Sequence, residues 1–212
     1  MLTFQGCGRI EFMMQTATNS VRETDEELMA RFQGGDSHAM EELFARFQKP
    51  LFNFFYRMVR RRETAEDLVQ ETFLKLCRFG NSFCGNNAKF TTWLYSVAGN
   101  QCRDYLRHSG RRPETPIGDL EDSQSDNQID FYHSNGESPV EESLIRAEIG
   151  ATLKTAISYL PEKERTAIIL REYQGLEYKE IAEVLGCPIG SVKVLIFRAR
   201  QRLRERLKGV FD

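Results

Sequence analysis

Apolar residues recur at helical spacing through two long blocks of the chain, and a polar stretch without such a period separates them. The first block runs from about Thr24 to Arg112, and the second begins at Ser138. Spacings of three and four residues place apolar side chains on one face of a helix. There is no strand signal longer than a few residues and no internal repeat. The pattern therefore predicts an all-α fold with two small helical domains joined by a flexible linker.

The first block contains four helical patterns, and residues with known capping or breaking roles mark their limits. Thr24 and Glu27 form a capping-box pattern before "ELMARF". Thr64 and Asp67 indicate a second cap, before "AEDLVQETFLKLCRF". Pro50 lies inside the long periodic stretch 36–61 and predicts a kink or break there. The fourth helix is predicted over "AKFTTWLYSVAGNQCRDYLR", after a loop rich in glycine and asparagine.

The second block opens with Ser138, Pro139 and Glu141, which combine an N-cap, a proline at the first helical position and an acid at N3. Four helices are predicted here, at about 139–159, 161–173, 178–185 and 189–207. The pair at 178–185 and 189–207 has helix-turn-helix spacing, because Gly186 breaks the first of the two where a left-handed residue is needed. The inner face of that first helix is predicted to be Ile181, Ala182 and Leu185. An ordinary helical hairpin is the alternative.

The last helix has a core stripe on one side and a basic face on the other. The predicted core stripe is Ile189, Val192, Ile196, Ala199 and Leu203. Val194 and Phe197 point the other way, beside Arg198 and Gln201. In a DNA-binding interpretation Lys193, Phe197 and Arg198 enter a major groove, where arginine can pair with guanine and apolar side chains can contact thymine methyls. Phosphate contacts are expected from Arg200, Arg202 and Arg204.

The fourth helix of the first block also has two faces. Its predicted core stripe is Phe90, Leu94, Val97, Ala98 and Tyr105, and another face carries Lys89, Trp93, Ser96, Asn100, Arg103 and Arg107. Cations beside an amide and an indole suit a single-stranded nucleic acid, because bases stack on aromatic rings while cations follow the backbone. The polar loop 82–88, which contains Phe83 and Asn86, could hold a base turned out of its stack. A solvated basic face is the alternative.

The helix over "AEDLVQETFLKLCR" presents a candidate protein-binding patch. Its predicted buried side is Ala65, Leu68, Val69, Thr72, Phe73 and Leu76, and its opposite side is Asp67, Gln70, Glu71, Leu74 and Arg78. An exposed leucine among polar side chains is typical of a docking surface with an apolar centre and a polar rim. Ordinary solvated helix surface is the alternative.

Charge and cysteine content narrow the picture further. The net charge of −2 over 212 residues hides an asymmetry, because the stretch from Pro113 to Glu142 has nine acids and no Lys or Arg. The stretch from Lys193 to Lys208 contains seven cations and one acid, a balance of +6.

No apolar run is long enough to span a membrane, so no membrane insertion and a cytoplasmic location are expected. The five cysteines form no CxxC pair. Idle thiols are expected, and the alternative is a zinc site from Cys77, Cys84, Cys102 and His108.

Three stretches in this order resemble the extracytoplasmic-function (ECF) subgroup of the bacterial sigma-70 family: "AEDLVQETFLKL", "FTTWLYSVAGNQCRDYLR" and "LPEKERTAIILREYQGLEYKEIAEVLGCPIGSVKVLIFRARQRL". The resemblance implies an RNA polymerase sigma factor that directs promoter-specific initiation. It divides the chain into an extension, 1–21, expected to be disordered; a sigma region 2 domain, 22–112; an acidic linker, 113–137; and a sigma region 4 helix-turn-helix domain, 138–212.

The resemblance also implies roles for individual residues and partners. Core RNA polymerase, through its clamp helices and flap, would be one partner, with the clamp contacting Asp67, Gln70, Glu71 and Leu74. Single-stranded DNA of the −10 element would meet Phe83, Asn86, Lys89, Trp93, Ser96, Asn100, Arg103 and Arg107. Duplex DNA of the −35 element would meet Ser191, Lys193, Val194, Phe197, Arg198 and Arg200. An anti-sigma factor is a further expected partner, and no cofactor, metal site or catalytic residue is expected.

Two other classes of protein remain as alternatives. A stand-alone regulator using the last helix pair would be a dimer that binds a palindrome without polymerase. An enzyme acting on nucleic acid would need clustered acids, a metal-ligand motif or a phosphate-cradling glycine loop, and the sequence shows none of these.

Overall fold

The computed structural model describes residues 23–85, 89–109 and 140–208. Within these ranges the chain has no strand, which confirms the all-α prediction. The elements are α1 (Asp25–Gln33), α2 (Ser37–Val59), α3 (Arg62–Phe79), the 3-10 helix η2 (Gly80–Ser82), α4 (Phe90–His108), α5 (Val140–Ser158), α6 (Glu162–Glu172), α7 (Tyr178–Leu185) and α8 (Ile189–Leu207). The predicted extension 1–21, the linker 113–137, the cap at Ser138 and Pro139, and Asn86 lie outside the described residues.

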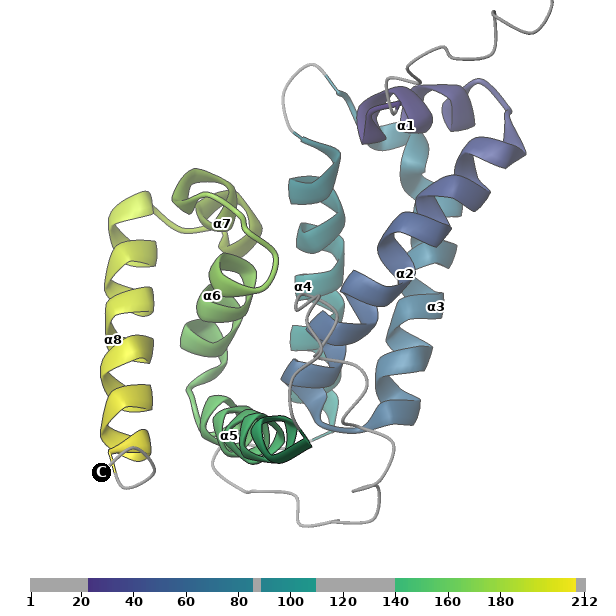
Figure 1. The fold of residues 1–212 in the computed structure, drawn as a ribbon. Helices are drawn as coiled ribbons and strands as arrows, with labels where there is room; N and C mark the ends of the chain where they lie inside the picture. Colours follow the sequence, from purple (N-terminus) through teal and green to yellow (C-terminus); the bar gives the residue numbers. More distant parts are fainter. Residues whose placement is uncertain (1–22, 86–88, 110–139, 209–212) are drawn as a thin grey trace, which may run out of the picture.

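The helices α1 to α4 form the first module, on the right of Figure 1, and α2 is its central element. Its buried side includes Leu43, Leu51, Phe54 and Phe55, none of which is exposed to solvent. Of the kink or break predicted at Pro50, the break is wrong, because α2 is a single helix through that residue. A proline removes one backbone donor, and the burial of the aromatic face on both sides of it keeps this helix packed against α3 and α4.

The helix starts show where capping patterns are informative and where they are not. Thr24 and Glu27 form the predicted capping box, with hydrogen bonds of 2.8 and 3.2 Å between side chains and backbone. The cap predicted at Thr64 is wrong, because α3 already begins at Arg62. The chain leaves α2 through Arg60, which has a left-handed φ of 58°, and re-enters a helix directly. Thr64 therefore lies inside α3.

The helices α5 to α8 form the second module, and they lie where the sequence predicts them. Gly186 ends α7 with φ 60°, as the helix-turn-helix pattern requires. Ile181 and Ala182 are buried with Val184, and Leu185 is half-buried. On α8, Val192, Ile196 and Ala199 are buried and Leu203 is half-buried. The prediction for Ile189 is wrong, since 44% of this residue is exposed in the first turn of α8.

The two modules pack against each other along α4 and α2 (Figure 1). The helix α4 contacts α7, while α2 contacts α5 and α6. The buried hydroxyl of Tyr95 on α4 donates a hydrogen bond to Gln174, in the turn between α6 and α7. The buried guanidinium of Arg165 on α6 donates to the Met58 carbonyl of α2 at 2.8 Å. These contacts join the two predicted domains in the described conformation.

Candidate nucleic-acid and protein interfaces

The outer face of α8 combines exposed apolar and basic side chains, as predicted. Val194 is 46% exposed and Phe197 is 61% exposed. Ser191, Lys193 and Arg198 are exposed on the same helix. The buried stripe on the opposite side packs on α6 and α7, and this packing turns the other residues outward. Exposed large apolar residues beside cations are suited to the edges and methyl groups of bases in a major groove.

Two of the arginines expected to bind phosphates are instead engaged within the second module. Arg200 Nη2 lies 2.7 Å from Glu172 Oε1, and this hydrogen bond raises the pKa of Arg200. Arg202 Nε lies 3.1 Å from Glu164 Oε2. Both contacts fasten α8 to α6. In contrast, Lys193 and Arg198 make no ion pair with any acid of the described ranges. The outer face of α8 therefore has cations available for a partner.

The predicted nucleic-acid face of α4 is only partly open. Asn100 and Arg107 are exposed, and Trp93 and Ser96 are half-buried. The Ser96 hydroxyl donates to the Thr92 carbonyl at 2.8 Å. Asn100 Oδ1 accepts a hydrogen bond of 3.0 Å from Arg103 Nη1. The amide and the cation of this face therefore form one local polar group.

The second module draws two cations of this face into ion pairs. Lys89 Nζ lies 2.9 Å from Glu180 Oε1 of α7, and the hydrogen bond raises the pKa of Lys89. Arg103 Nε lies 3.5 Å from Glu162 Oε1 of α6. Both cations remain substantially exposed, so the α4 face lies at the rim of the contact between the modules. A polyanion that bound this face would compete with both carboxylates.

The buried side of α4 is broader than its predicted core stripe. Phe90, Leu94 and Ala98 are buried as predicted, whereas Val97 and Tyr105 are half-buried. Tyr95 and Cys102 are buried although the sequence did not place them in the core. The helix α7 packs on this side. Burial raises the pKa of the Cys102 thiol to about 12, and Glu162 of α6 adds to this rise.

Phe83 belongs to an aromatic cluster at the start of α4. Its ring lies edge-on to Phe90, with 5.7 Å between the ring centroids, and 5.7 Å from Trp93. Only 7% of Phe83 is exposed. In the described conformation Phe83 therefore supports Trp93 from the core, and its contact with a flipped base stays a prediction. Lys89, the residue directly before α4, is exposed.

The two sides of α3 agree with the sequence pattern. The whole predicted apolar set on its inner side is buried. Asp67, Gln70 and Glu71 are exposed, and Leu74 is 53% exposed among them. Phe44 of α2 is also 41% exposed, and its ring centroid lies 4.7 Å from that of the buried Phe73. The arrangement suits a protein partner.

The predicted zinc alternative finds no support in the described residues. Cys102 is buried, while Cys77 and Cys84 are exposed. Within residues 23–85, 89–109 and 140–208, no three His, Cys, Asp or Glu side chains gather closely enough to hold a metal ion. No helix of these same ranges is long and apolar enough to cross a membrane.

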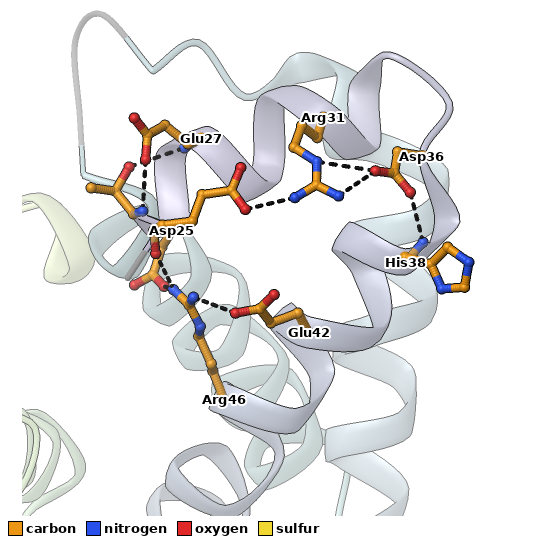
Figure 2. Close-up of polar contacts among 9 residues, drawn as sticks. Asp25, Glu27, Arg31, Asp36, His38, Glu42 and Arg46 are labelled. Carbon is orange, nitrogen blue, oxygen red and sulfur yellow. Dashed lines mark hydrogen bonds and ion pairs between the residues drawn. The ribbon is translucent and has the colours of Figure 1, made fainter. Parts of the chain in front are cut away.

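A charged network that the sequence reasoning missed holds α1 onto α2 (Figure 2). Arg31 pairs with Glu23 at 2.6 Å and with Asp36, and this hydrogen bond from Arg31 lowers the pKa of Asp36. Arg46 of α2 pairs with Asp25 at 2.8 Å and with Glu42. The sequence signal for it is the run of acids around the capping box, followed by Arg31 and Arg46. The network fixes where α1 lies beside the loop that precedes α4.

Comparisons with known proteins agree with this geometry. The family model described as Sigma-70 region 2 matches residues 43–112, and the model described as Sigma-70, region 4 matches residues 151–203. The RNA polymerase sigma-H factor of Pseudomonas aeruginosa is 38% identical over 88% of this chain and 95% of its own length. The ECF RNA polymerase sigma-E factor of Haemophilus influenzae is 37% identical over 87% of this chain and 96% of its own.

Solved structures share the fold. The sigma factor RpoE of Bartonella quintana, in complex with the anti-sigma factor NepR, matches with a TM-score of 0.60 and 26% identity, over 79% of this chain and 96% of that one. CnrH in complex with the cytosolic domain of CnrY matches with a TM-score of 0.63 and 22% identity, over 88% of this chain and 99% of that one.

Proposed function

The chain belongs to the ECF group of the sigma-70 family, and on this premise we propose which of its surfaces does each part of a sigma factor's work. A sigma factor binds core RNA polymerase and promoter DNA, and it is a transcription initiation factor. The proposal is that this chain has no catalytic activity of its own and acts in the cytoplasm. Each family model matches part of one module, residues 43–112 in the first and residues 151–203 in the second, which supports the proposal.

The second module is proposed to read the −35 element with the outer face of α8. Arg198 would pair with a base edge, while Val194 and Phe197 would contact thymine methyls. Ser191 and Lys193 lie at the N-terminal end of the helix, which is the end that enters the groove in helix-turn-helix proteins. Arg200 would reach a phosphate only by giving up Glu172. The exposure of Val194 and Phe197 beside Lys193 and Arg198, which pair with no acid of the described ranges, is the observation that carries this assignment.

The first module is proposed to bind the −10 element as a single strand. Trp93 offers a stacking surface, and Lys89, Arg103 and Arg107 lie along one side of α4. Ser96 and Asn100 would contact bases or sugar. Phe83 and Asn86 belong to the loop proposed to hold a flipped base.

The outer side of α3 is proposed to dock on the clamp helices of core polymerase. Leu74 would be buried at the centre of that contact, with Asp67, Gln70 and Glu71 around it. The second module is proposed to contact the polymerase flap. An anti-sigma factor is a further proposed partner, in line with the complexes in which sigma factors of this fold have been solved.

The described conformation cannot hold both promoter elements at once, so the proposal includes a separation of the modules. Packed helices lie 8–10 Å apart, and α7 contacts both α4 and α8, which places the axes of α4 and α8 roughly 20 Å apart. The −35 and −10 elements are about 25 base pairs apart, or roughly 85 Å of duplex at about 3.4 Å per base pair. Residues 110–139 allow a reach of up to roughly 100 Å.

Promoter-specific run-off transcription with core polymerase tests the whole assignment. The wild-type chain should support initiation at promoters selected from a random library. The Arg198→Ala variant should lose selectivity at the −35 element, and Leu74→Asp should weaken polymerase binding. A chain that never binds polymerase, or that binds a palindrome alone as a dimer, contradicts the proposal.

A further inference from the structure

The helix α1 contacts both ends of the loop that leads into α4. Gln33 Nε2, at the end of α1, donates hydrogen bonds to the backbone carbonyls of Gly80 and Phe83, each at 2.9 Å. These partners lie 47 and 50 residues further along the chain. One amide group therefore holds η2 and the residue that follows it in a fixed relation to α1.

The other end of the loop is fixed by Glu26. The N-cap residue of α4, Lys89, makes no side-chain capping bond. Glu26 Oε1 instead accepts a hydrogen bond of 2.8 Å from the backbone N–H of Phe90, the first residue of α4. A carboxylate at this position satisfies an orphan donor and interacts favourably with the positive end of the helix dipole. A distant helix thus supplies the cap that the local sequence lacks.

Close packing supports the same arrangement. A Cβ added at Gly80 would lie 2.6 Å from Met29 Cε and 3.4 Å from the Phe32 ring, so α1 sits directly on η2. Phe83, whose carbonyl Gln33 holds, packs its own ring against Phe90 and Trp93. The charged network of Figure 2 in turn holds α1 on α2. Contacts from α1 therefore add to the loop's own packing in positioning Phe83 and Phe90.

We propose that Gln33 and Glu26 are positioning residues for base selection at the −10 element. Neither touches DNA in this account. They hold Phe83 and Phe90, on either side of residues 84–89, at a fixed separation, so that Phe83 and Trp93 are already in place when a base arrives. Fixing the residues of a binding site beforehand improves affinity and selectivity, because less conformational entropy is lost on binding. The inference rests on the proposed role of this loop in −10 recognition.

The test compares variants of the full chain in complex with core polymerase. Gln33→Leu removes both donors at similar size, and Gln48→Leu makes the same change at an exposed position on α2 as a matched control. Glu26→Leu removes the acceptor, whereas Glu26→Gln keeps an oxygen that can still accept. Single-stranded −10 oligonucleotides, matched or mismatched at one position at a time, are titrated into each holoenzyme.

Gln33→Leu and Glu26→Leu should lower the ratio of matched to mismatched affinity by about 3- to 10-fold, as expected for one or two partly exposed hydrogen bonds. Glu26→Gln and Gln48→Leu should keep the wild-type ratio. Affinity for core polymerase and for duplex −35 DNA should stay unchanged, which separates positioning from loss of folding. If Gln33→Leu does not fold, the Glu26 pair carries the test.

The inference is overturned if both leucine variants discriminate as the wild type does, or if matched and mismatched strands lose affinity equally. A wild-type holoenzyme without any −10 preference would instead refute the proposed function itself. The two failures are therefore distinguishable.

Discussion

The hydrogen bond between Tyr95 and Gln174 gives a direct way to shift the modules apart. The Tyr95 hydroxyl is buried on α4 and donates to Gln174 of the second module. In Gln174→Ala this hydroxyl stays buried without a partner when the modules are in contact, but it is free to bond with water when they separate. A buried polar group left unsatisfied costs about 1–3 kcal/mol. The equilibrium should therefore move toward separation by about 5- to 150-fold.

Cys102 is a natural reporter of this equilibrium. It is 1% exposed, and the pKa of its thiol is raised to about 12, so a thiol reagent should react with it very slowly while the modules are in contact. Peptide mass spectrometry after timed labelling separates Cys102 from the exposed Cys77 and Cys84. The labelling rate of Cys102 in Gln174→Ala should rise with the separated fraction, while those of Cys77 and Cys84 should not change.

A double variant supplies the matched control. Tyr95→Phe combined with Gln174→Leu removes both partners, and replacing both partners of a hydrogen bond by apolar groups is nearly neutral. Its Cys102 should label at close to the wild-type rate. The reasoning fails if the single variant labels no faster than the wild type, or if single and double variants label equally fast. Equal helical content and thermal stability by circular dichroism show that the labelling does not report unfolding.

Four further outcomes are expected. Arg198→Ala should weaken binding to the −35 duplex by about 1–3 kcal/mol and relax selectivity at one base pair. Titration against single-base variants of the site at fixed salt measures both effects. An equal loss of affinity for all sequences would indicate a phosphate contact instead. Leu74→Asp should weaken affinity for core polymerase by about 1.5–3 kcal/mol, because burial of a leucine side chain contributes that much. A fluorescence competition assay measures the affinity. If the variant binds as tightly as the wild type, Leu74 is not part of the interface. The hydrogen bond from Arg31 lowers the pKa of Asp36, so the ion pair contributes to stability above the ordinary pKa of 3.8, and this contribution is lost as the pH falls below that value. The difference in thermal stability between wild type and Asp36→Asn should therefore shrink from pH 6 to pH 3. A difference that stays constant over this range contradicts the reasoning. Gly186→Ala should destabilise the protein by about 1–2 kcal/mol in urea unfolding, because φ is 60° at this position. No atom lies within 4 Å of an added Cβ there, so the loss reports the backbone conformation and not a clash. Gly190→Ala is the control and should not destabilise the protein, because Gly190 has no positive φ and its Cβ would also meet no atom.

The sequence by itself determined the features that depend on one or two turns of helix. The four helices of the second module, the capping box at Thr24 and the buried side of α3 follow from apolar spacing and from local hydrogen bonds. The outward direction of Val194 and Phe197 follows in the same way, because a stripe buried on one side of a helix turns the other side to solvent. These features need no knowledge of what each helix packs against.

Only the tertiary structure decided which surfaces meet. The continuity of α2 through Pro50, the exposure of Ile189 and the burial of Tyr95 and Cys102 depend on helices far away in the sequence. The same is true of the contact from Gln33 to the loop before α4. Helical periodicity fixes the direction of a side chain around its own axis. It carries no information about the neighbour on that side, which is chosen by packing and by charges that become close only when the chain has folded.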